Sequence, residues 1–268
     1  MTGPTTASAV TTPGALLAEP PGGRLRSDRG LWGFGGLHGG LVLAQLARAM
    51  GAAVPTGLLR SATARFHRPV RDEWSIETAV TRTGRTATTA VARAITDRGT
   101  SVDASAVFTT PAGTRWAAVS PAMPAAAHPD TLDVFTIPPE IVPFASHVEI
   151  RPATDALPYS GATEPELVAW IRFVEDDRPP DLPRLVTLLD ALAPSYIATV
   201  TDLTLAPTVE LTVTPADGLA LASSPWVLLR ATTRSASASG WIDEVIDAWG
   251  LEGNHLGSAH QLRVAVPG

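Results

Sequence analysis

The sequence contains no cysteine and no lysine, so all 20 of its basic residues are arginine. The absence of thiols excludes disulfides, cysteine nucleophiles and thiolate metal sites. The absence of lysine excludes catalysis through a lysine Schiff base. Carboxylates, histidines, hydroxyls and backbone groups remain as the candidate catalytic groups.

Charge is also scarce, because charged residues make up only 17% of the 268 residues and their sum is -6. Binding to DNA or RNA needs a basic surface that neutralises phosphates, so we expect no nucleic-acid partner. Hydrophobic residues make up 45% of the chain, which is enough to build a sizeable core. The composition therefore predicts a soluble globular protein.

Long hydrophobic runs are absent as well. The most apolar stretch, residues 39–59, is interrupted by Arg48 and Pro55, which argues against a membrane span. Residues 1–23 hold four prolines and one charged side chain, Glu19, so no basic segment precedes an apolar one as in a signal peptide. We expect a cytoplasmic protein in which residues 1–23 form a flexible tail.

An alanine-rich segment in the middle of the chain contains seven prolines between residues 111 and 143. Such a segment without clean periodicity is typical of a linker. We therefore expect a linker over residues 113–145, with a first unit at 24–112 and a second unit at 146–268.

The two units show signs of an internal duplication. WSIETAVTR at residues 74–82 and WVLLRATTR at residues 226–234 share four of nine residues at an offset of 152. The pair Ser105-Ala106 recurs as Ser258-Ala259 at an offset of 153. Two matches at nearly one offset favour a repeated unit over chance.

Each unit places an apolar helix before its strands, at residues 39–50 and 185–193. Both helices are apolar on nearly every face, so we expect them to be buried on all sides. Alternation and β-branched content predict strands in the second unit at residues 168–174, 209–213, 226–231 and 259–266. A helix wrapped by an antiparallel sheet is the hotdog arrangement. The expected fold class is therefore α+β, a double hotdog with two antiparallel sheets, each wrapped around a central helix.

Several familiar active-site motifs are missing. The pattern nearest to a serine nucleophile elbow, residues 253–257, has His255 in place of the serine. The glycine-rich run from Gly33 has His38 where the third glycine of a dinucleotide site belongs. The six histidines lack local metal-ligand spacing, so we expect neither a metal nor another cofactor. No Asp precedes a His by five residues, the pairing that hotdog hydratases use.

One buried charge stands out, because Asp190 is the only charged residue from Leu185 to Thr201. A carboxylate in an apolar helix costs several kcal/mol unless hydrogen bonds compensate it. Two interpretations stay open at this point. Asp190 is either a structural group that accepts bonds from the backbone beyond Pro194, or a general base.

The chain from about Trp32 to Val266 resembles the acyl-CoA thioesterase II family of double-hotdog enzymes. The resemblance is carried by the following motifs: Gly39-Gly40 with Val42 and Gln45, EIRP at residues 149–152, and WIR at residues 170–172. Asp190 in DALAP, Thr208 in PTVEL and Gln261 in HQL are similar to the family's catalytic Asp, Thr and Gln. The chain departs from the pattern at Glu210, where an Asp is usual.

The resemblance implies hydrolysis of an acyl-CoA to a free acid and CoA. Asp190, Thr208 and Gln261 would hold one water, and Asp190 would accept its proton. The N–H groups of Gly39 and Gly40 are our candidates for stabilising the oxyanion. Arginine side chains would bind the CoA phosphates. Because hotdog sheets commonly pair across an interface, we also expect a homo-oligomer.

Two alternatives remain. The first is a catalytically idle protein that binds an acyl-CoA or an acyl-carrier protein. The second is a hotdog dehydratase or an off-loading enzyme, which would be favoured if a histidine faced Asp190.

Overall fold

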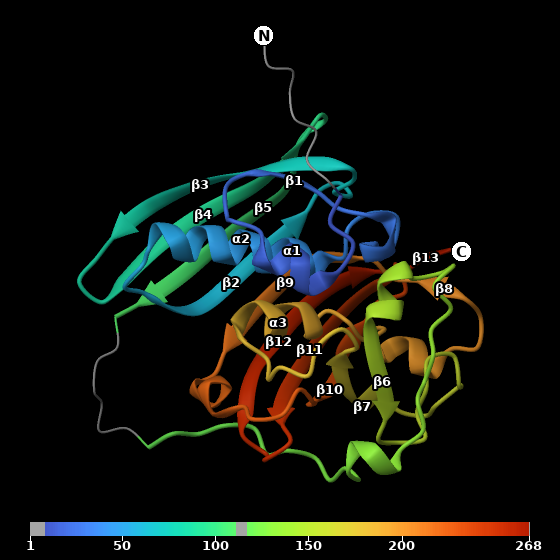
Figure 1. Cartoon of the computed structure of the whole chain (residues 1–268). Helices are drawn as coiled ribbons and strands as arrows, with labels where there is room; N and C mark the ends of the chain where they lie inside the picture. Colours follow the sequence, from blue (N-terminus) through green and yellow to red (C-terminus); the bar gives the residue numbers. More distant parts are fainter. Residues whose placement is uncertain (1–8, 111–116, 268) are drawn as a thin grey trace.

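The computed structural model describes residues 9–110 and 117–267, so the expectations for residues 1–8, 113–116 and 268 lie outside the described residues. Eleven strands of the described chain form one antiparallel sheet, in the order β1-β3-β4-β5-β2-β9-β12-β11-β10-β7-β6 (Figure 1). These strands have the following bounds: β1 Arg24–Arg26, β2 Leu58–Phe66, β3 Glu73–Thr83, β4 Ala87–Thr96, β5 Gly99–Thr109, β6 Val148–Pro152, β7 Glu166–Phe173, β9 Thr208–Pro215, β10 Val227–Ala236, β11 Trp241–Gly250 and β12 His255–Val264.

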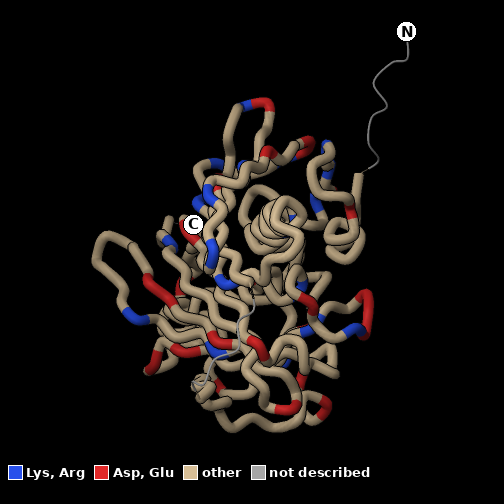
Figure 2. The backbone as a smooth tube through the Cα atoms, turned by 90° about the vertical axis from the view of Figure 1, so that its left-hand side faces the viewer, with Lys and Arg blue, Asp and Glu red and all other residues tan. Residues whose placement is uncertain are grey.

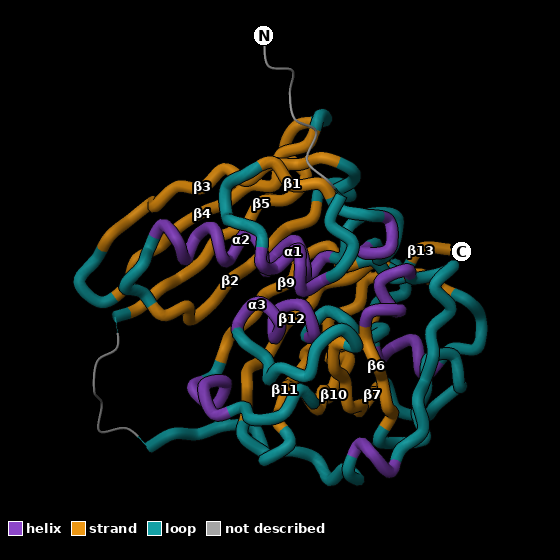
Figure 3. Tube along the Cα trace, viewed as in Figure 1, coloured by secondary structure: helices purple, strands orange, loops and turns teal. Residues whose placement is uncertain are grey.

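Within the described residues, three α-helices, five short 3-10 helices and a small second sheet complete the fold. The α-helices and the strands of the second sheet have the following bounds: α1 Pro13–Ala18, α2 Gly39–Ala53, α3 Leu182–Leu188, β8 Thr204–Leu205 and β13 Val266–Pro267. Figure 3 shows how long loops connect these elements in the second half of the chain, whereas the first half is mostly strand and helix. In the part of the chain that the structure describes, no helix is long and apolar enough to cross a membrane.

The two halves join edge to edge through β2 and β9, where we had expected two separate sheets. Thr63 lies opposite Thr212 at this junction, and their hydroxyls are 2.9 Å apart. An unpaired strand edge exposes backbone N–H and C=O groups. Pairing β2 with β9 gives these groups hydrogen-bond partners on both edges. The result is one continuous sheet that carries both halves of the molecule.

The internal repeat falls on equivalent strands of this sheet. In each half a helix is followed by four antiparallel strands, β2 to β5 and β9 to β12, and the two sets run outward from the β2–β9 junction in the same order. Trp74 lies on β3, and Trp226 immediately precedes β10. The two Ser-Ala pairs lie on β5 and β12. The sequence repeat therefore corresponds to a repeated structural unit.

Helix α2 packs against the strands of the first half and against α3. It contains one charged residue, Arg48, and is tan over most of its length in Figure 2. Residues 40–47 are all buried, as the apolar pattern predicts. A helix buried on nearly all sides fills the concave space that the strands leave.

The N-terminal segment differs from the expected flexible tail over its described part. Residues 13–18 form α1, and Leu16 is fully buried in the core. The Gln45 side chain donates to the Leu16 carbonyl, and Arg48 donates to the Glu19 carbonyl at 2.7 Å. Burial of Leu16 and these two polar contacts outweigh the proline content that predicted a tail.

Helix α3 is shorter than expected, because it ends at Leu188 and not at residue 193. The Asp190 N–H bonds to the Thr187 carbonyl at 3.2 Å, which tightens the chain into a turn. Pro194 disfavours helical geometry only in Ala193, so it does not by itself end the helix at Leu188. Asp190 therefore lies in the turn after α3, and not within a helix.

The described part of the linker packs against the sheet. The indole N–H of Trp170 donates to the Ala127 carbonyl at 2.9 Å, and that of Trp249 donates to the Pro121 carbonyl at 3.1 Å. Met123 also contacts the apolar cluster that contains both tryptophans. This segment thus covers part of the second half of the sheet.

Candidate active site

The turn after α3 and the first turn of α2 meet at Asp190. Oδ2 of Asp190 accepts a hydrogen bond of 2.7 Å from the Gly40 N–H, and the Asp190 side chain is only 5% exposed. The first N–H groups of a helix have no intrahelical partner and carry partial positive charge. The N-terminus of α2 therefore stabilises the negative charge of a carboxylate that belongs to the other half of the chain.

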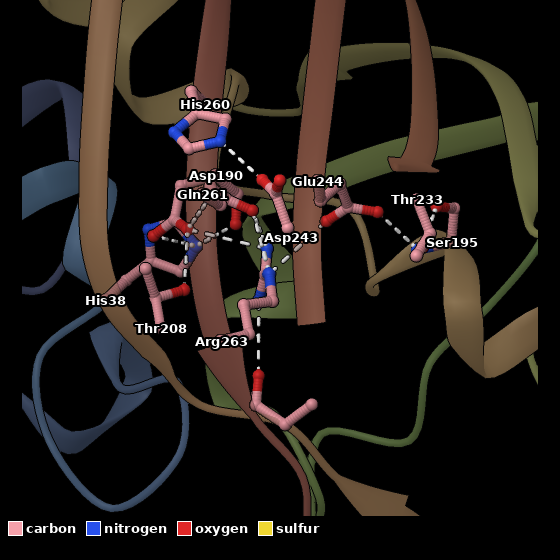
Figure 4. Close-up of polar contacts among 11 residues, drawn as sticks. His38, Asp190, Ser195, Thr208, Thr233, Asp243, Glu244, His260, Gln261 and Arg263 are labelled. Carbon is pink, nitrogen blue, oxygen red and sulfur yellow. Dashed lines mark hydrogen bonds and ion pairs between the residues drawn. The ribbon is translucent and has the colours of Figure 1, made fainter. Parts of the chain in front are cut away.

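The other carboxylate oxygen of Asp190 accepts hydrogen bonds from the two other side chains that we predicted for the site. Oδ1 accepts hydrogen bonds of 2.5 Å from the Gln261 amide and 3.3 Å from the Thr208 hydroxyl (Figure 4). Thr208 is the first residue of β9, and Gln261 lies on β12, which pairs with β9. The structure thus brings Asp190, Thr208 and Gln261 together, although 71 residues separate the first from the last.

The first two glycines of α2 are required because other atoms lie very close to the start of the helix. A Cβ on Gly39 would lie 2.9 Å from Asp190 Oδ2, and a Cβ on Gly40 would lie 2.9 Å from the Thr187 backbone. Real Cβ atoms do not come this close to other atoms. Gly39 and Gly40 therefore let the helix start reach both the carboxylate and α3.

The sequence did not single out His38 as a member of this site. His38 Nε2 lies 3.1 Å from the Asp190 main-chain carbonyl and 3.7 Å from Asp190 Oδ2, and its ring stacks on Phe144 at 3.9 Å. Burial lowers the pKa of His38 below 6.5, and the Asp190 carboxylate opposes that shift in part. His38 is therefore neutral near pH 7 and donates its Nε2–H to the carbonyl.

Arg263 was also missed. Its guanidinium donates to Oε1 of Gln261, with Nε at 2.8 Å, and Nη2 lies 3.7 Å from Asp190 Oδ1. Strand alternation places residues 261 and 263 on the same face, so the HQLR sequence carried a signal for this neighbour. His38 directly precedes the candidate residues Gly39 and Gly40, but its contact with Asp190 depends on how two distant helices pack.

A cavity of about 850 Å³ opens beside these residues. Its polar lining at the site comes from His38, Asp190, Thr208 and Arg263. The rest of the lining is largely apolar and includes Phe34, Leu37, Val42, Phe66, Phe135, Ile137, Ile141, Val142, Phe144, Leu192, Leu203, Leu205 and Val266. A mostly apolar cavity with a few convergent polar groups is typical of a small-molecule site. Within the described residues, no three His, Asp or Glu side chains are grouped so that they could hold a metal ion.

Comparisons with solved structures show the fold. A conserved protein of unknown function with a hot dog fold from Alicyclobacillus acidocaldarius is 21% identical, with a TM-score of 0.82 over 91% of this chain and 93% of that one. A provisionally named thioesterase II from Thermobifida fusca is 24% identical, with a TM-score of 0.77 over 91% and 92%. The acyl-CoA thioesterase II TesB2 from Mycobacterium marinum is 19% identical, with a TM-score of 0.67 over 86% and 89%. This chain therefore has the hotdog type of α+β fold.

Comparisons with sequences give the family. No curated protein matches the chain. The family model of the acyl-CoA thioesterase N-terminal domain matches residues 29–109, and that of the C-terminal domain matches residues 117–265. The second match includes most of the expected linker, in agreement with its packing on the second half. The chain belongs to the acyl-CoA thioesterase family.

Proposed function

We propose that this protein hydrolyses an acyl-CoA thioester by direct attack of a water that Asp190, Thr208 and Gln261 hold. The observation that carries the proposal is the convergence of the Thr208 hydroxyl and the Gln261 amide on Asp190 Oδ1. Asp190 and Thr208 line a largely apolar cavity, and Gln261 is fully buried at their side. This arrangement supplies a base and two groups that can orient the water beside a space for an acyl chain.

The reaction needs no covalent intermediate with the protein. Asp190 accepts a proton from the water as its oxygen forms a bond to the thioester carbonyl carbon. The carbon–sulfur bond of the tetrahedral intermediate then breaks. The CoA thiolate takes the proton from Asp190, so the products are the free acid and CoA, and the base is restored.

The developing oxyanion needs a hydrogen-bond donor that the substrate can reach. The Gly40 N–H already donates to Asp190 Oδ2, so its part in our proposal is to hold the base. Gly39 is the first residue of α2, its N–H has no intrahelical partner, and the residue lines the cavity. We assign the Gly39 N–H to the oxyanion, where the positive end of α2 adds to its effect.

We also infer that the two halves are two hotdog units that share one sheet. The support is the equivalent order of β2 to β5 and β9 to β12, each set preceded by a helix. The active site would then use the helix start of one unit and the polar side chains of the other. Because the duplication places both units in one chain, a single chain can form the whole site.

The position of His38 favours a second candidate function. A histidine that faces Asp190 is the feature that we associated with a hotdog dehydratase or an off-loading enzyme, and the two side chains approach to 3.7 Å. However, the Nε2–H of His38 faces the Asp190 carbonyl, and its ring is stacked on Phe144. These contacts fit a structural histidine better than a second proton-transfer group.

The test is thiol release from a panel of acyl-CoAs of different chain lengths. Because the protein has no cysteine, a thiol reagent reports only released CoA. We expect turnover with at least part of the panel. Acyl-CoA binding without thiol release would favour the idle binding protein, and reversible dehydration of a hydroxyacyl-CoA without thiol release would favour the dehydratase.

A further inference from the structure

Two buried charges of opposite sign lie next to the proposed site and have no part in the mechanism above. Arg263 on β12 is 3% exposed, and Glu244 on β11 is fully buried. Glu244 lies directly opposite Gln261 in the β11–β12 pairing, and Arg263 follows Gln261 by two residues on the same face. A buried ion pair costs desolvation free energy that hydrophobic residues of the same size would avoid, so its presence next to Gln261 calls for a role.

The guanidinium makes its best hydrogen bonds with Gln261. Both Nε and Nη2 of Arg263 donate to Oε1 of Gln261, and Nη1 lies 3.4 Å from the Ala206 carbonyl. The Glu244 carboxylate lies 3.3 Å from Nε but outside hydrogen-bonding geometry, since that N–H faces Gln261. Figure 4 shows Arg263 between Asp190 and Glu244, with Gln261 at its side.

Glu244 is itself fixed to the segment that follows Asp190. Its Oε1 accepts a hydrogen bond from the Ser195 N–H, and the Ser195 hydroxyl lies 2.8 Å from that of Thr233. Glu244 therefore holds Arg263 through charge, and Arg263 holds Gln261 through hydrogen bonds. This chain of contacts ends at the amide that faces the proposed base.

A glutamine amide can rotate by 180° and exchange its oxygen with its NH2 group. While Asp190 is ionised, its carboxylate can only accept hydrogen bonds, so the NH2 group of Gln261 faces it. In the proposed reaction Asp190 carries a proton during each turnover, and a protonated carboxyl group can also donate. Arg263 has no acceptor, so it keeps Oε1 of Gln261 on its own side throughout the cycle.

We propose that Arg263 is a positioning residue for thioester hydrolysis, which fixes the Gln261 amide with Nε2 toward Asp190 and the attacking water, and that Glu244 holds Arg263 in place. This inference rests on the proposed function. Arg263 acts through Gln261 and not through the substrate, although it lines the cavity. Loss of Arg263 should therefore lower kcat and leave KM nearly unchanged.

The main test is the double variant Arg263→Met/Glu244→Gln, which removes both charges and keeps an oxygen for the Ser195 N–H. We expect its kcat to fall by about 10- to 100-fold, with KM within about twofold of the wild-type value. Adding Gln261→Ala to this variant should lower kcat by less than about threefold, because the effects of groups that act as a unit are not additive. In the wild-type background, Gln261→Ala should lower kcat by a larger factor than it does in the double variant.

Two further variants separate positioning from stability. Arg263→Lys keeps the charge beside Glu244 but only one donor for Gln261, so its kcat should lie between those of the wild type and the double variant. Arg184 is a matched control, since it is also a buried arginine, 6% exposed, and pairs with Asp176 at 2.9 Å. Arg184→Met should lower the melting temperature without lowering kcat per folded molecule.

A second measurement does not depend on turnover. The side-chain amide resonances of Gln261, assigned by their loss in Gln261→Ala, should be protected from hydrogen exchange in the wild type and exchange faster in Arg263→Lys and in the double variant. If the wild type releases no thiol from any acyl-CoA, the proposed function fails, and the amide signal alone decides whether Arg263 orients Gln261. Three results would overturn the inference: unchanged kcat, a raised KM at constant kcat, or unchanged exchange of the Gln261 amide.

Discussion

The Gly40 N–H donates to Asp190 Oδ2 at 2.7 Å and so joins two residues that lie 150 positions apart. Gly40 belongs to the helix of the first half, and Asp190 to the turn after the helix of the second half. Neither half contains both groups. The approach of these two segments therefore builds the proposed site, and it depends on glycine at the start of α2.

Substitution at Gly40 tests this approach. Gly40→Ala places a Cβ 2.9 Å from the Thr187 Cα and carbonyl oxygen, which belong to backbone that cannot easily move. We expect a loss of about 1–3 kcal/mol in the free energy of unfolding, together with reduced turnover. Denaturant unfolding and thiol release measure the two effects.

Gly51 in the same helix is the matched control. Its added Cβ would meet only Phe108 Cε1 at 3.9 Å, an ordinary contact. Gly51→Ala should stabilise the protein by about 0.5–1 kcal/mol, since alanine favours a helix interior. Equal stability of the two variants would show that the α2–α3 approach does not require Gly40.

His38 should make stability depend on pH. Burial lowers its pKa below 6.5, so between its folded-state pKa and 6.5 the unfolded chain binds more protons than the folded one. The free energy of unfolding should consequently decrease as the pH falls from about 7 to about 5.5. His38→Gln keeps a donor for the Asp190 carbonyl, and its free energy of unfolding should decrease less than that of the wild type over this pH range.

Urea unfolding at several pH values checks this expectation. His255 also has a pKa lowered by burial and contributes in the same direction, so His255→Gln is measured beside it. The same pH dependence in the wild type and in His38→Gln would show that His38 is not the group that titrates.

Ala191 should influence which acyl chains are accepted. It lines the cavity next to Asp190 and is only partly buried. Ala191→Phe adds a ring to the cavity wall, so kcat/KM should shift toward shorter acyl chains. A chain-length profile identical to that of the wild type would place the acyl chain in another part of the cavity.

Much of the candidate site could be predicted from the sequence, because Asp190, Thr208 and Gln261 lie in short motifs that resemble a family. The charge of Asp190 in an apolar segment also marked it without any resemblance. The contact of His38 with Asp190 depends on packing between distant elements, which local patterns do not encode, whereas the contact of Arg263 with Gln261 follows from the alternation of side chains along β12. The end of α3 at Leu188 and the burial of α1 were missed for the same reason, since tertiary packing overrides helix and proline signals.

Thr208 and Gln261 should act with Asp190 as one unit. Thr208→Ala and Gln261→Ala should each lower kcat by about 10- to 100-fold, because each removes one hydrogen bond that orients the water. Combined with Asp190→Asn, they should add little. Steady-state kinetics of the single and double variants measure this, and multiplicative losses would show that the three groups act independently.

The most direct test of the account is kcat of Asp190→Asn for thiol release, normalised to folded protein. The amide keeps the shape of the side chain and one oxygen for the Gly40 N–H, but it cannot accept a proton from water. Because its NH2 group faces the Gln261 amide, the variant should be less stable by about 1–2 kcal/mol and still fold. We predict a fall in kcat of about 10²- to 10⁴-fold, whereas a near wild-type kcat of the folded variant would contradict the proposed mechanism.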